Sequence, residues 1–275
     1  MSEPTVVTLA DPAACALAAA ERIIEILDVA IDDRGEAHWV TTGGSAPGAI
    51  YGHLASEPLR DELDWRKVRL WFTDERFVPL DHNLSNAKIA FDRLLDAGAF
   101  GGMSGTGQSG ADVTAGRDPG VPIRSDNVHP IPVAGAIAEG RDPDWAASRY
   151  VEEIRADGPD EDDDGRPAFD LILLGVGSDG HILSVFPGSA AFDERAWAVG
   201  IPAPTHIEPH VARVTLNPAL VPAAHELLVV STGEEKAEVL ADVLKGPEDP
   251  RRLPAQLARR AGATWILDRA AAARL

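Results

Sequence analysis

The sequence contains little cysteine, no long apolar run and no basic N-terminal flank. Its one cysteine, Cys15, excludes an internal disulfide and suits a reducing compartment. No run of about 18 apolar residues occurs, so no membrane span is expected. The N-terminus opens polar and acidic, unlike a signal peptide. Together these features predict a cytoplasmic protein.

Basic residues are also scarce. The chain has 25 Lys and Arg against 44 Asp and Glu, which gives a formal net charge of −19. Such a charge repels nucleic acid and anionic membranes, so neither is expected as a partner. An anionic small molecule would need basic side chains gathered locally against this field. With 275 residues, 45% of them hydrophobic, the chain can bury a sizeable core.

Several catalytic and metal-binding motifs are missing. No stretch completes the G-x-S-x-G of a serine hydrolase, although 43–47 (GGSAP) comes close. The G-K-[ST] ending of a phosphate-binding P-loop does not occur. His206 and His210 are four residues apart, but Pro209 prevents a regular helix between them, and no cysteine cluster is present. We therefore expect no metal and no cofactor.

Short apolar runs alternate with helical patterns along the chain. The runs predict strands at Thr5–Leu9, Ala37–Thr42, Val68–Thr73, Val128–Ile131, Phe169–Gly175, Val211–Leu216, Leu227–Ser231 and Thr264–Leu267. Helices are expected from Asp11 or Pro12 through Ile31, and at Pro47–Leu54, Ser85–Leu95, Asp142–Arg155, Glu234–Leu244 and Leu253–Arg260. This alternation predicts a single α/β domain over 1–275, with a Rossmann-like, doubly wound, mostly parallel sheet covered by helices on both faces.

Two segments interrupt the alternation. Residues 98–127 are rich in Gly, Ser, Thr and Asp without periodicity, and we interpret them as a flexible insertion. Residues 157–164 (DGPDEDDD) form an acidic turn. Their spacing is not that of a calcium-binding EF-hand loop, so a solvated connection is expected there. No internal repeat is found.

In an open parallel sheet, ligands bind beyond the carboxyl ends of the strands. After the second predicted strand, Gly43, Gly44 and Ser45 precede a helix, where backbone amides and a hydroxyl can cradle a phosphate. An ordinary turn with a serine cap would look the same. After the third strand come Asp74-Glu75-Arg76 and, later, Ser85-Asn86 at a helix start. Packing does not readily explain three charges at a strand end, although a surface cluster would look the same.

The stretch 175–180 (GVGSDG) matches the dinucleotide-binding pattern G-x-G-x-x-G. That pattern requires a long helix from its third glycine, and Pro187-Gly188 would end one early. The carboxylate of Asp179 would also repel a pyrophosphate. We therefore interpret Gly177 and Gly180 as glycines that position Asp179 and His181, while a histidine that only caps a turn remains the alternative.

Two basic residues occur late in the chain, next to predicted strands. Arg213 lies on a strand, and Lys236 opens a helix, where the helix dipole disfavours a cation. A functional reason for Lys236 is therefore plausible, although Glu234 and Glu235 could balance its charge.

Taken in order, these loops resemble the 6-phosphogluconolactonases, which share a fold with the glucosamine-6-phosphate deaminases. The stretches that carry the resemblance are Gly43-Gly44-Ser45 with Pro47, Asp74-Glu75-Arg76 with Val78-Pro79 and Ser85-Asn86, Gly175 to Gly188, Arg213-Val214-Thr215, and Gly233-x-x-Lys236. Ile182 and Leu183 depart from the family's usual Thr-Ala after the histidine. Phe186 precedes Pro187 where the deaminases carry a catalytic Glu, which favours the lactonase.

The resemblance implies hydrolysis of a sugar-phosphate lactone by a monomer or weak dimer. An imidazole titrates near pH 6.5, so His181 could take a proton from water, with Asp179 orienting the ring or holding substrate hydroxyls. Arg76 or loop amides would stabilise the oxyanion, and Asp74 is placed in the same catalytic set. The substrate phosphate is expected among Gly44, Ser45, Arg213 and Lys236, with Gly43, Asn86, Gly177 and Gly180 also in the binding set. A deaminase or a non-catalytic sugar-phosphate-binding module are the alternatives.

Overall fold

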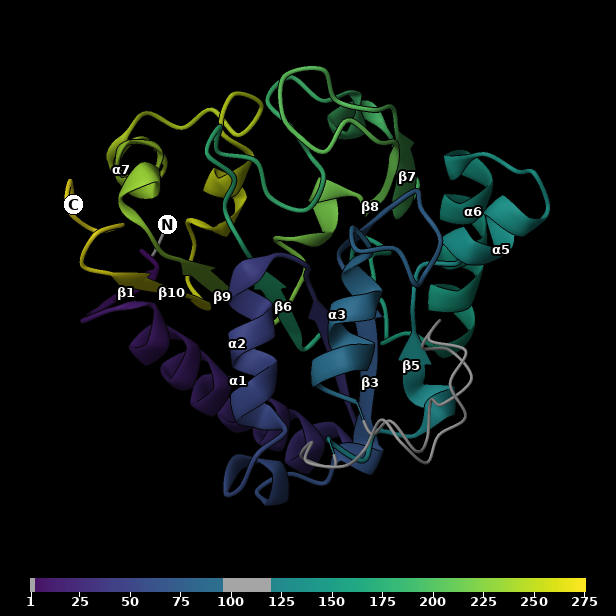
Figure 1. Ribbon diagram of the computed structural model, residues 1–275, viewed down its shortest axis with the longest axis horizontal. Coiled ribbons are helices and arrows are strands. Elements are labelled where there is room, and N and C mark those ends of the chain that lie inside the picture. The colour runs from purple at the N-terminus through teal and green to yellow at the C-terminus, as the bar shows by residue number, and fades with distance from the viewer. Residues whose placement is uncertain (1–2, 96–119) are drawn as a thin grey trace.

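The computed structural model describes residues 3–95 and 120–275, except for the side chain of Ser45. Within this part, seven parallel strands form one sheet in the order β1-β10-β9-β6-β2-β3-β5 (Figure 1). They are β1 (Thr5–Leu9), β2 (Ala37–Thr41), β3 (Val68–Phe72), β5 (Val128–His129), β6 (Leu171–Leu174), β9 (Glu226–Ser231) and β10 (Ala263–Asp268). The predicted α/β fold with a mostly parallel sheet is confirmed.

The central strands are apolar without alternation because helices or loops cover both faces of the sheet. Every residue of β2 and of β6 is buried. Trp39 on β2, Trp71 on β3 and Trp265 on β10 are among the largest fully buried side chains. Their burial fixes the sheet as a rigid base for the loops at its carboxyl edge.

The helices begin and end where local chemistry requires. They are α1 (Pro12–Arg34), α2 (Ser45–Leu54), α3 (Asn86–Arg93), α5 (Val133–Ala138), α6 (Pro143–Asp157) and α7 (Ala237–Lys245). The longest, α1, begins after Asp11, whose carboxylate accepts the Ala14 N–H at 2.9 Å, and ends at Gly35 in the left-handed region. Short 3₁₀ helices occur at Leu59–Asp61, Trp65–Lys67, Ser125–Asn127, Ala190–Asp193, Pro218–Leu220, Glu234–Lys236 and Pro254–Ala258.

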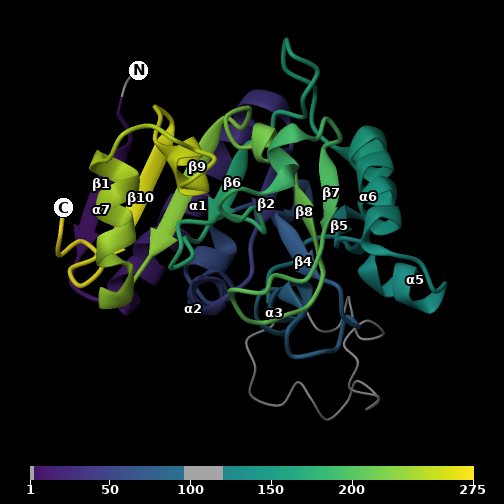
Figure 2. The ribbon, with the colours of Figure 1, turned by 90° about the horizontal axis from the view of Figure 1, so that it is seen from above.

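A second, antiparallel sheet packs against α6 beside the large one (Figure 2). Its order is β4-β8-β7, with β4 (Asp74–Arg76), β8 (Arg213–Leu216) and β7 (Ala198–Ile201). The strand predicted at Val211–Leu216 therefore begins at Arg213 and does not belong to the parallel sheet. In this pairing Arg76 lies opposite Arg213. The small sheet thus brings the charged stretch after β3 next to a basic residue from late in the chain.

Other parts of the chain differ from the sequence-based expectation. Strands β4 and β7 and helix α5 were not predicted, and the helix expected at Leu253–Arg260 is a 3₁₀ helix at Pro254–Ala258. Of the predicted flexible insertion, 98–119 lies outside the described residues. Within 120–127, Val121 forms a β-bridge with Leu95, and both Val121 and Ile123 are buried.

The direction of the chain reverses at the centre of the large sheet. From β2 it proceeds outward to β3 and β5, and from β6 it proceeds the other way to β9 and β10. Helices α1 and α2 pack against each other, with α1 against the large sheet, whereas α6 packs against the small sheet. Such a switch point opens a crevice at the carboxyl ends of the two central strands. Of the helices described, none is long and apolar enough to cross a membrane.

Candidate active site

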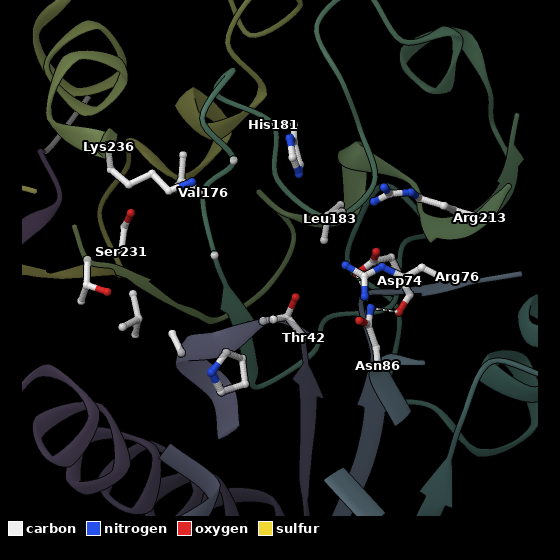
Figure 3. Close-up of a pocket in the computed structure, with 18 of the residues that line it drawn as sticks. Thr42, Asp74, Arg76, Asn86, Val176, His181, Leu183, Arg213, Ser231 and Lys236 are labelled. Carbon is white, nitrogen blue, oxygen red and sulfur yellow. Dashed lines mark hydrogen bonds between the residues drawn. The ribbon is translucent and has the colours of Figure 1, made fainter. Parts of the chain in front are cut away.

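A cavity of about 310 Å³ lies at this switch point, beyond the carboxyl ends of β2, β3, β6 and β9 (Figure 3). Its wall includes side chains from five predicted loops or strands that are far apart in sequence. Of the predicted site residues, the cavity wall contains Gly43, Gly44, Asp74, Arg76, Asn86, Gly177, His181, Arg213 and Lys236. The sheet therefore gathers most of the predicted set in one place.

The loop after β6 uses its glycines to bring His181 close to the backbone. The Gly177 N–H donates to the His181 carbonyl at 2.8 Å, which folds the loop back on itself. A methyl group at Gly177 would lie 2.1 Å from Nδ1 of His181. Gly180 has φ +83°, and a methyl group there would lie 2.7 Å from Leu253. The glycines thus position a histidine, in agreement with the interpretation of this loop.

His181 and Asp179 form a close pair. Nδ1 of His181 lies 2.5 Å from Oδ1 of Asp179, and the same oxygen accepts the His181 backbone N–H at 3.1 Å. Burial opposes ionisation of Asp179, but the hydrogen bonds and charge of His181 hold the pKa of this carboxyl well below its usual range. With Nδ1 donating to a charged carboxylate, Nε2 is the ring nitrogen that can accept a proton.

Ile182 and Leu183, the two departures from the family pattern, have different surroundings. Ile182 is fully buried in the core. Leu183 lines the cavity next to His181 and has φ 55°, which is unusual for a residue with a side chain (Figure 3). The larger side chain at 183 therefore forms part of the wall beside the histidine.

Arg213 is a buried cation on the opposite side of His181 from Lys236 (Figure 3). It donates to the Pro209 carbonyl at 3.2 Å and lies 3.5 Å from Oγ of Ser184. Burial lowers the pKa of its guanidinium, and the nearby charge of Asp74 opposes this shift. Its Nε has no hydrogen-bond partner among the described residues. A buried cation with an unused donor is suited to bind an anion.

Asp74 is buried at the base of the cavity, with 4% of its surface exposed. Oδ2 accepts the Ser184 hydroxyl at 2.6 Å, and Oδ1 accepts the Thr73 hydroxyl at 2.9 Å. Asn86 donates from Nδ2 to the Asp74 carbonyl at 2.9 Å and lies 3.3 Å from Oδ1. Both oxygens are thus engaged by protein donors, and Asp74 does not contact His181.

Glu75, the middle residue of the charged stretch, anchors the start of α3. Its carboxylate accepts the backbone N–H groups of Arg76, Asn86 and Ala87 and the hydroxyl of Ser85, all between 2.7 and 2.9 Å. Burial raises the pKa of Glu75, and these donors oppose that shift. Glu75 was not among the predicted site residues, although its charge, between two such residues and ahead of a helix start, could have indicated this role.

Arg76, Asn86 and Gly43 complete one wall. Arg76 donates to the Leu84 carbonyl at 2.9 Å. A methyl group at Gly43 would lie 1.7 Å from Oδ1 of Asn86, so the glycine allows this amide to reach the cavity. Lys236 lines the far wall with Glu235, beside the Gly233 turn, whose N–H donates to Asp268 at 3.1 Å. Cations therefore stand on both sides of the crevice.

Three predicted residues are not on the cavity wall. Asp179 lies behind His181, and Gly180 supports the loop through its carbonyl, which accepts the Ala255 N–H at 2.9 Å. Ser45 begins α2, and its side chain lies outside the described residues. No group of three or more His, Cys, Asp or Glu in the described ranges could hold a metal ion. The two histidines considered as metal ligands have different partners: His206 contacts Asp179, whereas Nδ1 of His210 lies 2.7 Å from the Pro204 carbonyl.

The fold and crevice define an α/β protein in which a histidine paired with a carboxylate lies between cations on the two sides of the crevice. The profile of the glucosamine-6-phosphate isomerases/6-phosphogluconolactonase family matches residues 10–266. The 6-phosphogluconolactonase of Streptomyces coelicolor is 32% identical, with 99% of this chain and 95% of the relative covered. That of Mycobacterium tuberculosis is 32% identical, with 94% and 93% covered.

Solved structures show the same similarity. The 6-phosphogluconolactonase from Trypanosoma cruzi superposes with a TM-score of 0.80 at 28% identity, covering 100% of this chain and 98% of that one. The enzyme from Trypanosoma brucei also gives 0.80, at 26% identity and 100% of both chains. This chain belongs to the glucosamine-6-phosphate isomerase/6-phosphogluconolactonase family.

Proposed function

We propose that the protein hydrolyses 6-phospho-D-glucono-1,5-lactone to 6-phospho-D-gluconate, the second step of the oxidative pentose phosphate pathway. Relatives at about a third identity over nearly the whole chain bear this activity in their names. The observation that carries the proposal is that His181, paired with Asp179, lies on the wall of a crevice that Arg76, Arg213 and Lys236 also line. A base beside clustered cations suits hydrolysis of an anionic ester.

In the proposed mechanism His181 acts as general base. Nε2 takes a proton from water as the water oxygen bonds to the lactone carbonyl carbon. Arg76 or loop amides stabilise the oxyanion that develops. The bond from the carbonyl carbon to the ring oxygen then breaks, and His181 returns the proton to that oxygen. Asp179 holds the ring through Nδ1 and stabilises its charged form.

The substrate phosphate is proposed to bind among Gly44, Ser45, Arg213 and Lys236. Support comes from the position of three of these residues, Gly44, Arg213 and Lys236, on the cavity wall. These cations provide the local positive field that a chain of net charge −19 otherwise lacks. Asn86 and Gly43 would shape the side of the cavity next to the sugar ring.

The activity is tested with purified protein and freshly prepared 6-phosphogluconolactone, by following acid release above the spontaneous rate. Ammonia release from glucosamine 6-phosphate is measured in parallel, because a deaminase would produce it. We expect the first and not the second. Ammonia release without lactone hydrolysis would identify a deaminase, and binding without either reaction would identify a sugar-phosphate-binding module.

A cytoplasmic location and a monomeric or weakly dimeric state stay predictions from the sequence. Size-exclusion chromatography with light scattering measures the second over a range of concentrations.

A further inference from the structure

The carboxylate of Asp179 lies between two imidazoles. Its Oδ1 pairs with His181, and its Oδ2 lies 3.3 Å from Nε2 of His206, 27 residues further along the chain. His206 belongs to the loop between β7 and β8, and its spacing from His210 in the sequence raised only the question of a metal site. Two histidines from separate loops thus contact one carboxylate.

The ring of Phe186 contacts both histidines. Its centroid lies 4.8 Å from that of His181, and it meets the His206 ring edge-on at 5.4 Å. The Arg213 guanidinium lies over the same ring, at 5.1 Å from its centroid. Although 53% of the His206 side chain is exposed, its inner edge is therefore fixed by both a hydrogen bond and a ring contact.

The loop that carries His206 is tied to the rest of the site. His210 closes it through the Pro204 carbonyl at 2.7 Å, and Arg213 donates to the Pro209 carbonyl at 3.2 Å. These bonds limit the movement of the loop relative to Asp179. The position of His206 is thus coupled to the same arginine that lines the cavity.

We propose that His206 is a positioning residue of the catalytic centre, which holds the outer oxygen of Asp179 and, once protonated, opposes protonation of His181. The proposal rests on the proposed function, because it takes His181 as the base. Two imidazolium ions on one carboxylate repel each other, so a proton on either histidine disfavours a proton on the other. A residue at position 206 that cannot be protonated removes this repulsion.

Other charged groups face His206 from the neighbouring elements. An adjoining cavity is lined by Phe186, His206 and two carboxylates, and the Asp144 carboxylate there accepts the Gly200 N–H at 3.1 Å. The titratable and charged groups that contact His206 or share its surroundings are Asp179, His181, Arg213, Asp144 and Glu194, and Glu208 and His210 follow it on the same loop. Of these residue types, histidine is the one whose unperturbed side-chain pKa lies near neutral pH.

Two variants separate the charge of His206 from its hydrogen bond. In His206→Gln the amide can still donate to Asp179 but cannot be protonated. We expect the acid limb of the kcat/KM profile to move to higher pH by about half a unit. In His206→Ala the hydrogen-bond donor to Asp179 is lost as well. We expect the acid limb of the kcat/KM profile to move in the same direction, and the pH-independent kcat to fall about tenfold, as for other groups that orient a functional histidine. The glutamine variant should recover most of that kcat, and KM should change little in either.

His225→Gln is the matched control, because His225 is an exposed histidine at the amino end of β9, away from the carboxyl ends that form the cavity. Its pH profile should match that of the wild type. If the His206→Gln profile also matches while the wild type hydrolyses the lactone, the proposal is overturned and the function stands.

NMR titration of the His181 imidazole without substrate gives an independent answer. The midpoint should rise in His206→Gln by a similar amount, and an unchanged midpoint would overturn the proposal. This titration tests the role of His206 whether or not the protein hydrolyses the lactone. A wild-type protein that does not hydrolyse it would overturn the proposed function.

Discussion

At the scale of single residues, Asp74 and Asp179 have the same functional group and different surroundings. Asp74 is buried, and its oxygens accept hydroxyl groups from Ser184 and Thr73. Asp179 contacts the imidazole of His181. These contacts suit Asp74 to fixing the residues around Arg213 and suit Asp179 to supporting the base, a division that the sequence motifs alone left open.

The closeness of Gly177 to the His181 ring gives the first prediction. In Gly177→Ala the new methyl group would lie 2.1 Å from Nδ1, so the ring must leave Asp179. We expect kcat to fall at least about a hundredfold, the scale of a lost general base. Steady-state kinetics measure this fall in kcat, and thermal unfolding shows separately whether the substitution also lowers stability.

Gly175→Ala is the control, because Gly175 also lines the cavity and a methyl group there would meet nothing within 4 Å. It should retain most of the activity. Equal kcat values for the two variants would contradict the proposed positioning of His181 by Gly177.

Among the secondary-structure elements, the small antiparallel sheet brings two basic side chains to the cavity, and a third comes from a 3₁₀ helix. β8 carries Arg213 and pairs with β4, which carries Arg76, while Lys236 ends a 3₁₀ helix beyond β9. Because these elements enter the crevice from different sides, each cation can be removed without moving the other.

Arg213→Ala and Lys236→Ala are expected mainly to raise KM, by about tenfold or more, because each removes a charge-assisted contact with the phosphate. If both hold the same phosphate, the KM of the double variant should differ from the product of the two single effects. Unchanged KM in both single variants would place the phosphate elsewhere. Circular dichroism checks that Arg213→Ala, which removes a buried side chain, remains folded.

At the scale of the whole molecule, the parallel sheet was predictable because strands buried on both faces have an unbroken apolar sequence. The run 171–174 (LILL) is an example, and polar loops after such strands marked the crevice. Strand β4 was not predictable in this way, since its residues Asp74–Arg76 are all charged and are held by pairing with a strand much later in the chain, Asp74 with Thr215, 141 residues away. Nor was the contact between His206 and Asp179, which depends on the path of an irregular loop.

The core contains a histidine whose protonation should link stability to pH. His38 is buried, Nδ1 accepts from Nε1 of Trp71 at 3.3 Å, and Nε2 lies 3.4 Å from Glu36. Burial lowers the pKa of His38, against the opposing effect of Glu36. Below about pH 6.5 the unfolded chain therefore binds a proton that the folded chain resists, and the free energy of unfolding falls as the pH falls.

Urea unfolding at pH 7 and pH 5 tests this with His38→Asn, whose amide oxygen can still accept from Trp71. The variant should be less stable at pH 7, by about 1 kcal/mol for the altered buried contacts. It should also lose less stability than the wild type between the two pH values. An equal loss in both proteins would mean that His38 does not contribute to the pH dependence.

The proposed mechanism requires His181, held by Asp179, to take the proton from the attacking water. The most direct measurement is kcat for 6-phosphogluconolactone hydrolysis by His181→Ala, corrected for spontaneous hydrolysis. We expect kcat to fall at least about a hundredfold with little change in KM, because the residue acts on the transition state. A kcat close to that of the wild type would contradict it.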